Sequence, residues 1–211
     1  SMYLSTLIGT GFVERRVPVT DSGSSRLGRH HITDPYLRFY YRFLSRRQSQ
    51  LALGIADQAL EEIKKHLVDF IGTHTWEELC REWLLRASGK KILPYLPDQI
   101  GSVWNRDAQV DVVGINTMDK TMILGECKWD RHPIDLDVLQ KLVEKTDKVI
   151  PGDGQWKVYY LGFSRKGWTA GAQKFAKSIK AGKTSGINWQ ATGMLLRTLD
   201  QVDEELENWS G

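Results

Sequence analysis

Three side chains in one stretch of the chain are of the types that bind a divalent cation and stabilise a phosphate: Asp111, Glu126 and Lys128. They lie on two β-type runs separated by a polar segment, residues 116–121. Successive side chains of a strand point to opposite faces, so Glu126 and Lys128 share a face. If the polar segment forms a hairpin loop, counting back along both strands places Asp111 opposite Glu126. The spacing therefore predicts a carboxylate pair with an amine beside it.

Two adjacent carboxylates repel each other unless a positive group lies between them. Mg²⁺ and Mn²⁺ accept oxygen ligands of this kind, often one or two carboxylates with water and phosphate oxygens. A lysine ammonium can then stabilise the negative charge that builds on a phosphate under attack. The alternative is an ordinary solvated ion pair on an exposed strand. The metal site is favoured because neighbouring apolar residues predict buried strands, where carboxylates are rarely unpaired: Val110, Val112, Ile123 and Leu124.

A helix before these strands could supply a third carboxylate. Its core-facing stripe follows the i, i+3, i+4, i+7, i+8 pattern at Trp76, Leu79, Cys80, Trp83 and Leu84. Thr75 and Glu78 have the spacing of a capping box, which assigns Glu78 a structural role. Glu77 lies at the edge of the apolar stripe, so it is the better candidate for the site.

The elements after the two strands alternate between helix and strand. The apolar patterns predict helices over 135–149, 168–179 and 200–209, and strands over 156–163 and 194–199. This order is typical of an α/β fold in which helices flank a mixed sheet.

The N-terminal part has a different pattern. It predicts a short helix over 3–8, a strand over 12–19, a polar turn over 20–27 and a second short strand that includes His31 and Ile32. This succession is how a winged helix ends, without the helices that come first in that motif. We therefore expect a partial winged helix here.

A helical region follows this motif. Asp34 and Pro35 suit the N-cap and first position of a helix. Residues 56–71 form an amphipathic pattern that Gly72 is expected to end, with a buried side made of Leu60, Ile63, Leu67 and Phe70. We therefore predict two parts: a partial winged helix with a helical linker over 1–72, and an α/β domain over 73–211.

The positive charge of the chain is concentrated near its start. Residues 1–50 contain eight arginines, no lysine and three acidic residues, a net charge of +5, so the remainder carries −2 of the total of +3. Helical spacing aligns three of these arginines on one stripe. Together with two strand arginines they are candidates for binding nucleic-acid phosphates: Arg15, Arg16, Arg38, Arg42 and Arg46. A solvated or partner-binding surface is the alternative.

Composition excludes several classes of protein. No apolar run approaches the roughly 20 residues that a membrane-spanning helix needs, and no signal peptide is visible. Cys80 and Cys127 have neither a disulfide framework nor a zinc-ligand spacing. We therefore expect a cytoplasmic protein without membrane contact.

Five segments resemble one known family. They are GFVERRVPVT, ITDPYLRFYYRF, WEELCREWL, VDVVGI and, most specifically, GECKW at 125–129. They are similar to the C-terminal region of archaeal-type P-loop ATPases, whose last domain belongs to the PD-(D/E)xK nuclease superfamily.

The resemblance implies a restriction-endonuclease-like fold and Mg²⁺- or Mn²⁺-dependent cleavage of a phosphodiester, with DNA as the expected partner. It implies that Glu77, Asp111, Glu126 and Lys128 are catalytic, and that the three acids bind the metal. It also implies an ATPase domain upstream in the same protein. No GxxxxGK[ST] motif occurs here, so this chain is not expected to hydrolyse ATP by itself.

One position departs from the family pattern. Relatives often carry an acid two residues before the strand aspartate, where this chain has Gln109. Loss of that carboxylate lowers the local negative charge and favours a single metal or no catalysis. Two alternatives therefore stay open: a non-catalytic module that binds DNA or a protein for the ATPase, and a structural or oligomerisation domain.

Overall fold

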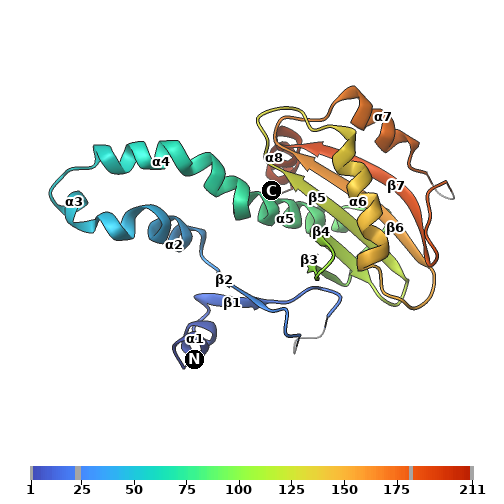
Figure 1. The fold of residues 1–211 in the computed structure, drawn as a ribbon, viewed down its shortest axis with the longest axis horizontal. Helices are drawn as coiled ribbons and strands as arrows, with labels where there is room; N and C mark the ends of the chain where they lie inside the picture. The colour runs from blue at the N-terminus through green and yellow to red at the C-terminus, as the bar shows by residue number, and fades with distance from the viewer. Residues whose placement is uncertain (1, 22–24, 181–182, 210–211) are drawn as a thin grey trace. The chain divides into compact units, whose positions relative to one another are not determined.

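The computed structural model describes residues 2–21, 25–180 and 183–209. The chain forms two compact units, each described here by itself (Figure 1). Unit 1 comprises Ser1–Arg16 and Gly28–Thr75, and unit 2 comprises Val17–Leu27 and Trp76–Gly211. The division after Thr75 lies three residues beyond the boundary expected after residue 72.

Unit 2 is built on a five-stranded mixed sheet, which confirms the predicted α/β class. The strand order is β3-β4-β5-β6-β7. The first two pairings are antiparallel, and β5 pairs with β6 and β6 with β7 in parallel. The strands are β3 (Gln99–Trp104), β4 (Gln109–Asn116), β5 (Thr121–Lys128), β6 (Trp156–Ser164) and β7 (Trp189–Thr198). The last strand begins at Trp189 rather than at the expected residue 194.

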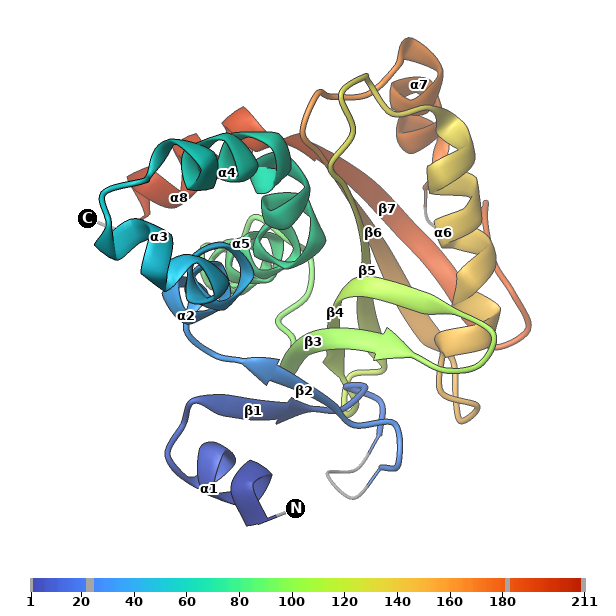
Figure 2. The same cartoon turned by 60° about the vertical axis from the view of Figure 1, so that its left-hand side comes forward.

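Helices cover both faces of this sheet (Figures 1 and 2). The helices α6 (Leu136–Val149) and α7 (Ala170–Ser178) pack on one face, and α5 (Trp76–Gly89) and α8 (Leu199–Asn208) on the other. Asp135 caps the N-terminus of α6 by accepting a hydrogen bond from a backbone N–H. None of the helices described combines the length and the apolar character needed to cross a bilayer.

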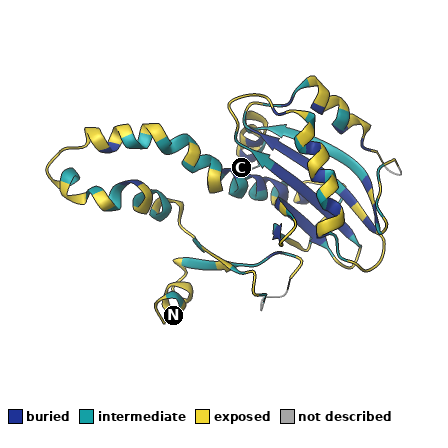
Figure 3. Cartoon of the chain, viewed as in Figure 1, coloured by how far each residue is buried: buried dark blue, intermediate teal, exposed yellow. Residues whose placement is uncertain are grey.

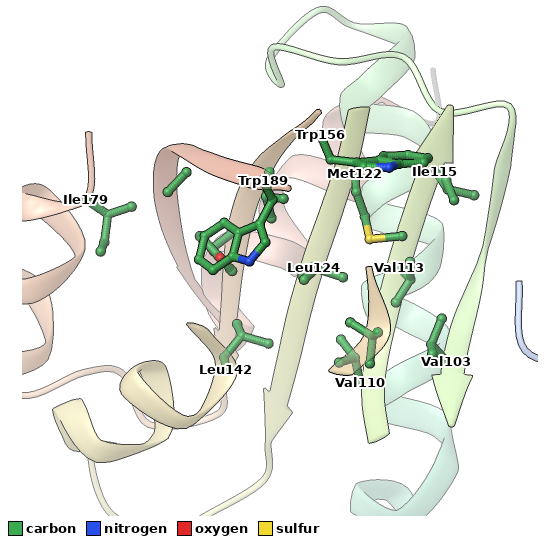
Figure 4. Packing of buried hydrophobic residues seen from close by; sticks show 14 residues of the cluster. Val103, Val110, Val113, Ile115, Met122, Leu124, Leu142, Trp156, Ile179 and Trp189 are labelled. Carbon is green, nitrogen blue, oxygen red and sulfur yellow. The ribbon is translucent and has the colours of Figure 1, made fainter. Parts of the chain in front are cut away.

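The pairing of β4 with β5 has the register expected from the sequence. Ile115 pairs with Met122 and Val113 with Leu124, and these four side chains lie side by side in the core (Figure 4). Each is at most 2% exposed. The central strands are almost wholly buried (Figure 3). A slip of one residue would turn these apolar side chains to the opposite face, so burial holds the register.

Unit 1 begins with the elements expected of a wing. A short helix α1 (Met2–Gly9) precedes β1 (Val13–Arg16) and β2 (Arg29–Ile32), which pair in antiparallel. Both strands are four residues long, so the first is shorter than the expected run over 12–19. Residues 22–24 of the expected turn lie outside the described residues.

The arginine-rich helix of unit 1 is irregular. Asp34 caps α2 (Pro35–Phe39) as predicted and accepts hydrogen bonds from the backbone N–H groups of Tyr36 and Leu37. The chain then passes through a π-helical turn and a 3₁₀ turn before it returns to an α-helix, at η1 (Tyr40–Leu44), η2 (Ser45–Arg47) and α3 (Gln48–Ala52). A π-helix forms i→i+5 hydrogen bonds, so side chains four apart no longer repeat along one α-helical stripe.

The next helix does not end where the sequence predicts. After α4 (Asp57–Phe70), Gly72 lies inside a second π-helical turn, η3 (Ile71–Thr75), which runs directly into α5. A helix interior tolerates glycine at a cost of about 1 kcal/mol, so glycine alone need not stop it. Thr75 is the last residue of that turn, so α5 continues from it and does not start at the expected capping box. The predicted burial of Leu60 is also wrong, because this side chain is 47% exposed.

Candidate functional site

The pairing of β4 with β5 brings Asp111 to the strand that carries Glu126. Val112 pairs with Gly125, so Asp111 and Glu126 occupy the next positions along the two strands. The backbone N–H of Cys127 donates a hydrogen bond to Asp111 Oδ2 at 3.0 Å. This bond holds the Asp111 carboxylate against β5, as the predicted register requires.

Glu126 lies between two lysines. Lys128 Nζ donates to Glu126 Oε1 at 2.6 Å, and Lys145 Nζ of α6 donates to Glu126 Oε2 at 2.7 Å. The Glu126 side chain is only 8% exposed. A carboxylate this buried requires compensating charge, and here each of its oxygens receives an ammonium donor.

Glu77 approaches the site from α5. Arg81, one helical turn later, places Nη1 3.7 Å from Glu77 Oε2. The same Nη1 donates to the Asp111 backbone oxygen at 3.0 Å and to Ser102 Oγ at 2.9 Å. Ser102 Oγ also donates to the Asp111 backbone oxygen, at 2.7 Å. Arg81 and Ser102 therefore join α5, β3 and β4 around the strand aspartate.

The electrostatics of the site follow from this crowding of acids. Burial and the nearby Asp111 carboxylate raise the pKa of Glu77 to about 7, against the opposing effect of Arg81. Burial and Glu126 also raise the pKa of Asp111, although the Cys127 N–H and Lys128 oppose this. Burial alone would lower the pKa of Lys128, but the Glu126 carboxylate outweighs it and raises that pKa. The site therefore holds protons more strongly than isolated carboxyl groups do.

The donor set suits one hard divalent cation held by two carboxylates. Across residues 2–21, 25–180 and 183–209, no group of three or more His, Cys, Asp or Glu side chains is placed to share a metal ion. Mg²⁺ needs only one or two protein carboxylates, because water and phosphate oxygens complete its octahedron. Asp111 and Glu126 are the two carboxylates of the site that could serve as such ligands, although both oxygens of Glu126 accept from lysines in this structure. Glu77, with Arg81 beside it, is better placed as an outer residue than as a direct ligand.

The sequence interpretation missed Lys145, although the chain carries a signal for it. Lys145 lies on the buried stripe of α6, between Leu142 and Val149 at helical spacing. A lysine among core positions usually has a buried anionic partner. The partner could not be identified, because the sequence does not show which strand α6 covers.

The five arginines proposed for phosphate binding all belong to unit 1. Arg15 and Arg16 lie on β1, Arg38 on α2, Arg42 in η1 and Arg46 in η2. Arg16 Nε donates to the Glu14 side chain at 2.6 Å. Gln109, the position where relatives carry an acid, is the first residue of β4 and is exposed.

Two comparisons with known proteins find relatives. Residues 40–146 match the DUF234 family, described as archaeal and bacterial proteins of unknown function. An uncharacterized protein of Methanocaldococcus jannaschii is 31% identical over 160 residues, which cover 75% of this chain and 36% of that protein. The chain thus spans about a third of the length of that relative. No solved structure matches the chain.

Proposed function

Since the chain belongs to the DUF234 family, whose function is unknown, we propose an activity from the site itself. Unit 2 is a PD-(D/E)xK-type domain that cleaves phosphodiester bonds in nucleic acid. DNA is the expected substrate. One observation carries this proposal. Asp111 faces the strand of Glu126, and Lys128 donates to Glu126 beside them. Two carboxylates and a lysine this close together support metal-dependent hydrolysis of a phosphodiester, since Mg²⁺ takes carboxylate ligands and an ammonium can stabilise phosphate charge.

Each residue has a separate role in this proposal. Asp111 and Glu126 would hold Mg²⁺ or Mn²⁺, which would supply Lewis-acid stabilisation of the phosphoryl group and activation of water. Lys128 would turn its ammonium from Glu126 to the phosphate and stabilise the charge that develops there. That exchange is favourable because the cation would replace the ammonium as the counter-charge of Glu126.

Glu77 and Arg81 would position the water and the strand. Arg81 holds the Asp111 backbone through a hydrogen bond, while the Glu77 carboxyl can accept a hydrogen bond from a water near the phosphate. Gln109 brings no negative charge to this edge of β4, which favours a single metal ion over two.

The basic unit would bind the nucleic-acid backbone. Each phosphate contact releases condensed counterions, so the affinity depends on salt concentration with a slope of about −0.9 per contact. If all five arginines make a contact, the slope of log K against log salt is about −4 to −5. A slope near zero would count against nucleic acid and favour a protein partner.

We further propose that a P-loop ATPase domain acts with this chain in the full-length protein. The support is the similarity of five sequence segments to the C-terminal region of such ATPases. Self-association of the chain is compatible with this arrangement, and gel filtration measures it directly.

Cleavage assays with matched variants test the proposed chemistry. The wild type should nick plasmid DNA with Mg²⁺ or Mn²⁺ and not with EDTA. Asp111→Asn and Lys128→Ala should each lower the rate by on the order of 100-fold or more. Asp119→Asn is the matched control, because Asp119 is an exposed carboxylate in the turn of the same hairpin. Wild-type protein that cleaves neither DNA nor RNA with either ion would contradict the proposal.

A non-catalytic binding module is the second candidate, and one observation favours it. Both oxygens of Glu126 accept hydrogen bonds from lysines, so the charge of this carboxylate is already balanced by two ammonium groups. In that case Lys145 and Lys128 would serve the stability of unit 2, and nucleic acid would bind without cleavage. Mn²⁺ binding measured by electron paramagnetic resonance separates the two candidates: binding that Asp111→Asn removes supports the nuclease, and no Mn²⁺ binding supports the module.

A further inference from the structure

Unit 1 contains a cavity rich in nitrogen donors. Its volume is about 470 Å³, within the usual range for small-ligand sites. Two arginines and four histidines line it: Arg38, Arg42, His30, His31, His66 and His74. The whole chain has only five histidines. Four of these five imidazoles therefore line one cavity, together with two guanidinium groups.

The cavity lies where the helical backbone is irregular. Arg42 belongs to the π-helical turn η1, and His74 belongs to the π-helical turn η3. Such turns are rare and are found frequently at functional sites, because the extra residue redirects side chains that an α-helix would place elsewhere. Here both turns direct donors into the same cavity, and α2 contributes Arg38 between them.

The charges of the lining favour an anion. Arg38 and Arg42 contribute two positive charges and Asp69 one negative charge, so the net charge is +1 with neutral imidazoles. A guanidinium offers a planar fork of N–H donors that matches phosphate oxygens. A neutral imidazole adds one further donor, and a protonated one adds two. His66 Nε2 lies 3.4 Å from Glu62 Oε1, so that nitrogen faces an acid outside the lining. Ile32 and Phe70 form an apolar wall of the same cavity.

We propose that this cavity is a binding site for a phosphate group, either a backbone phosphate of nucleic acid or the phosphate of a small phosphorylated ligand. The arginines supply the charge and the fork geometry, and the histidines supply further donors around the anion. The proposal sharpens the phosphate-binding role given to unit 1, but it does not rest on hydrolysis in unit 2. A failed cleavage assay therefore leaves it intact, and a failed binding assay leaves the nuclease proposal intact.

The histidines provide a direct measurement. Protein labelled with ¹⁵N-histidine is titrated with inorganic pyrophosphate at constant pH and ionic strength, and imidazole resonances are followed by NMR. His132 belongs to unit 2 and serves as an internal control. We expect saturable shifts of the four cavity imidazoles and none of His132. Equal shifts of all five, or no shift, would overturn the proposal.

Two double variants that each lose two positive charges distinguish binding in the cavity from general electrostatic attraction of the anion to the protein. Arg38→Gln/Arg42→Gln should weaken pyrophosphate binding by at least about tenfold, since charge-assisted hydrogen bonds are lost. Lys64→Gln/Lys65→Gln removes the same two charges from α4 at residues that do not line this cavity. This control should bind as the wild type does. Equal weakening in both double variants would overturn the proposal.

A third titration identifies the source of the phosphate. A short DNA duplex replaces pyrophosphate under the same conditions. Shifts of the same four imidazoles assign the cavity to the nucleic-acid backbone. Pyrophosphate binding that the duplex neither reproduces nor competes with assigns it to a small phosphorylated ligand. The proposal would be overturned if the duplex binds without shifting the four imidazole resonances and pyrophosphate does not shift them either.

Discussion

Replacing Glu77 with glutamine should change how the stability of unit 2 depends on pH. Burial and Asp111 raise the pKa of Glu77 from 4.5 to about 7 in the folded protein. The folded state therefore binds this proton more tightly than the unfolded chain does. The stabilisation is fully present below pH 4.5 and is lost as the pH rises through about 7. Glutamine has no proton to lose, so the variant should not show this loss.

The size of the effect follows from the two pKa values. One pKa unit corresponds to about 1.4 kcal/mol, and integrating between pH 5 and pH 8 attributes about 2.5 kcal/mol to this group. The Glu77 side chain is 27% exposed, so solvent screens part of the interaction. We expect the wild-type free energy of unfolding to fall by about 2 kcal/mol more than that of Glu77→Gln over this range.

Urea unfolding at pH 5 and pH 8, in EDTA, measures this difference. Arg81 keeps its hydrogen bonds to Ser102 and to the Asp111 backbone in the variant, so the local structure should persist. Glu82→Gln is the matched control, because Glu82 is a 44% exposed acid of the same helix, paired with Arg86. The control should retain the wild-type pH dependence. Parallel loss of stability in the wild type and Glu77→Gln would refute the electrostatic reasoning.

Three further substitutions test the packing around the site by urea unfolding. Leu124→Ala should lower the free energy of unfolding by about 2–5 kcal/mol, because Leu124 is 0% exposed in a central strand and its loss leaves a cavity; a smaller loss would mean that the core collapses around the gap. Lys145→Met should cost about 1–2 kcal/mol, since Glu126 then loses one charged donor, and an unchanged midpoint would show that the pair adds nothing. Gly162→Ala should cost about 1–3 kcal/mol, because its new Cβ would lie 2.6 Å from Leu196 Cδ2 and 2.7 Å from the ring of Trp168; a neutral outcome would mean that both side chains can shift at little cost.

The carboxylate pair could be predicted from sequence because it depends on short-range rules. Side chains alternate along a strand, and a short polar loop sets the register of the two strands it joins. Asn116 pairs with Thr121, so the turn at 117–120 is even shorter than the segment expected to form the loop. Apolar residues on both strands then lock that register through burial.

Other features could not be predicted, because they depend on residues distant in sequence. Lys145 reaches Glu126 only because α6 packs against β5, the central strand of the sheet, and nothing in the local pattern of α6 identifies its partner. The helix around Gly72 continues for a related reason. A glycine in a helix interior is about 1 kcal/mol less favourable than an alanine. Packing and continued backbone hydrogen bonding easily outweigh this cost.

Side-chain periodicity and turn length are enough to predict the α/β class, the hairpin register and the proximity of two acids and a lysine. The electrostatic state of those groups, in contrast, depends on how distant segments pack in the folded chain. The tertiary structure placed Lys145 on Glu126, set Glu77 beside Arg81 and gathered four histidines around one cavity in unit 1. Burial and neighbouring charge control these properties, and both are set by which segments pack together rather than by the order of residues within any one segment.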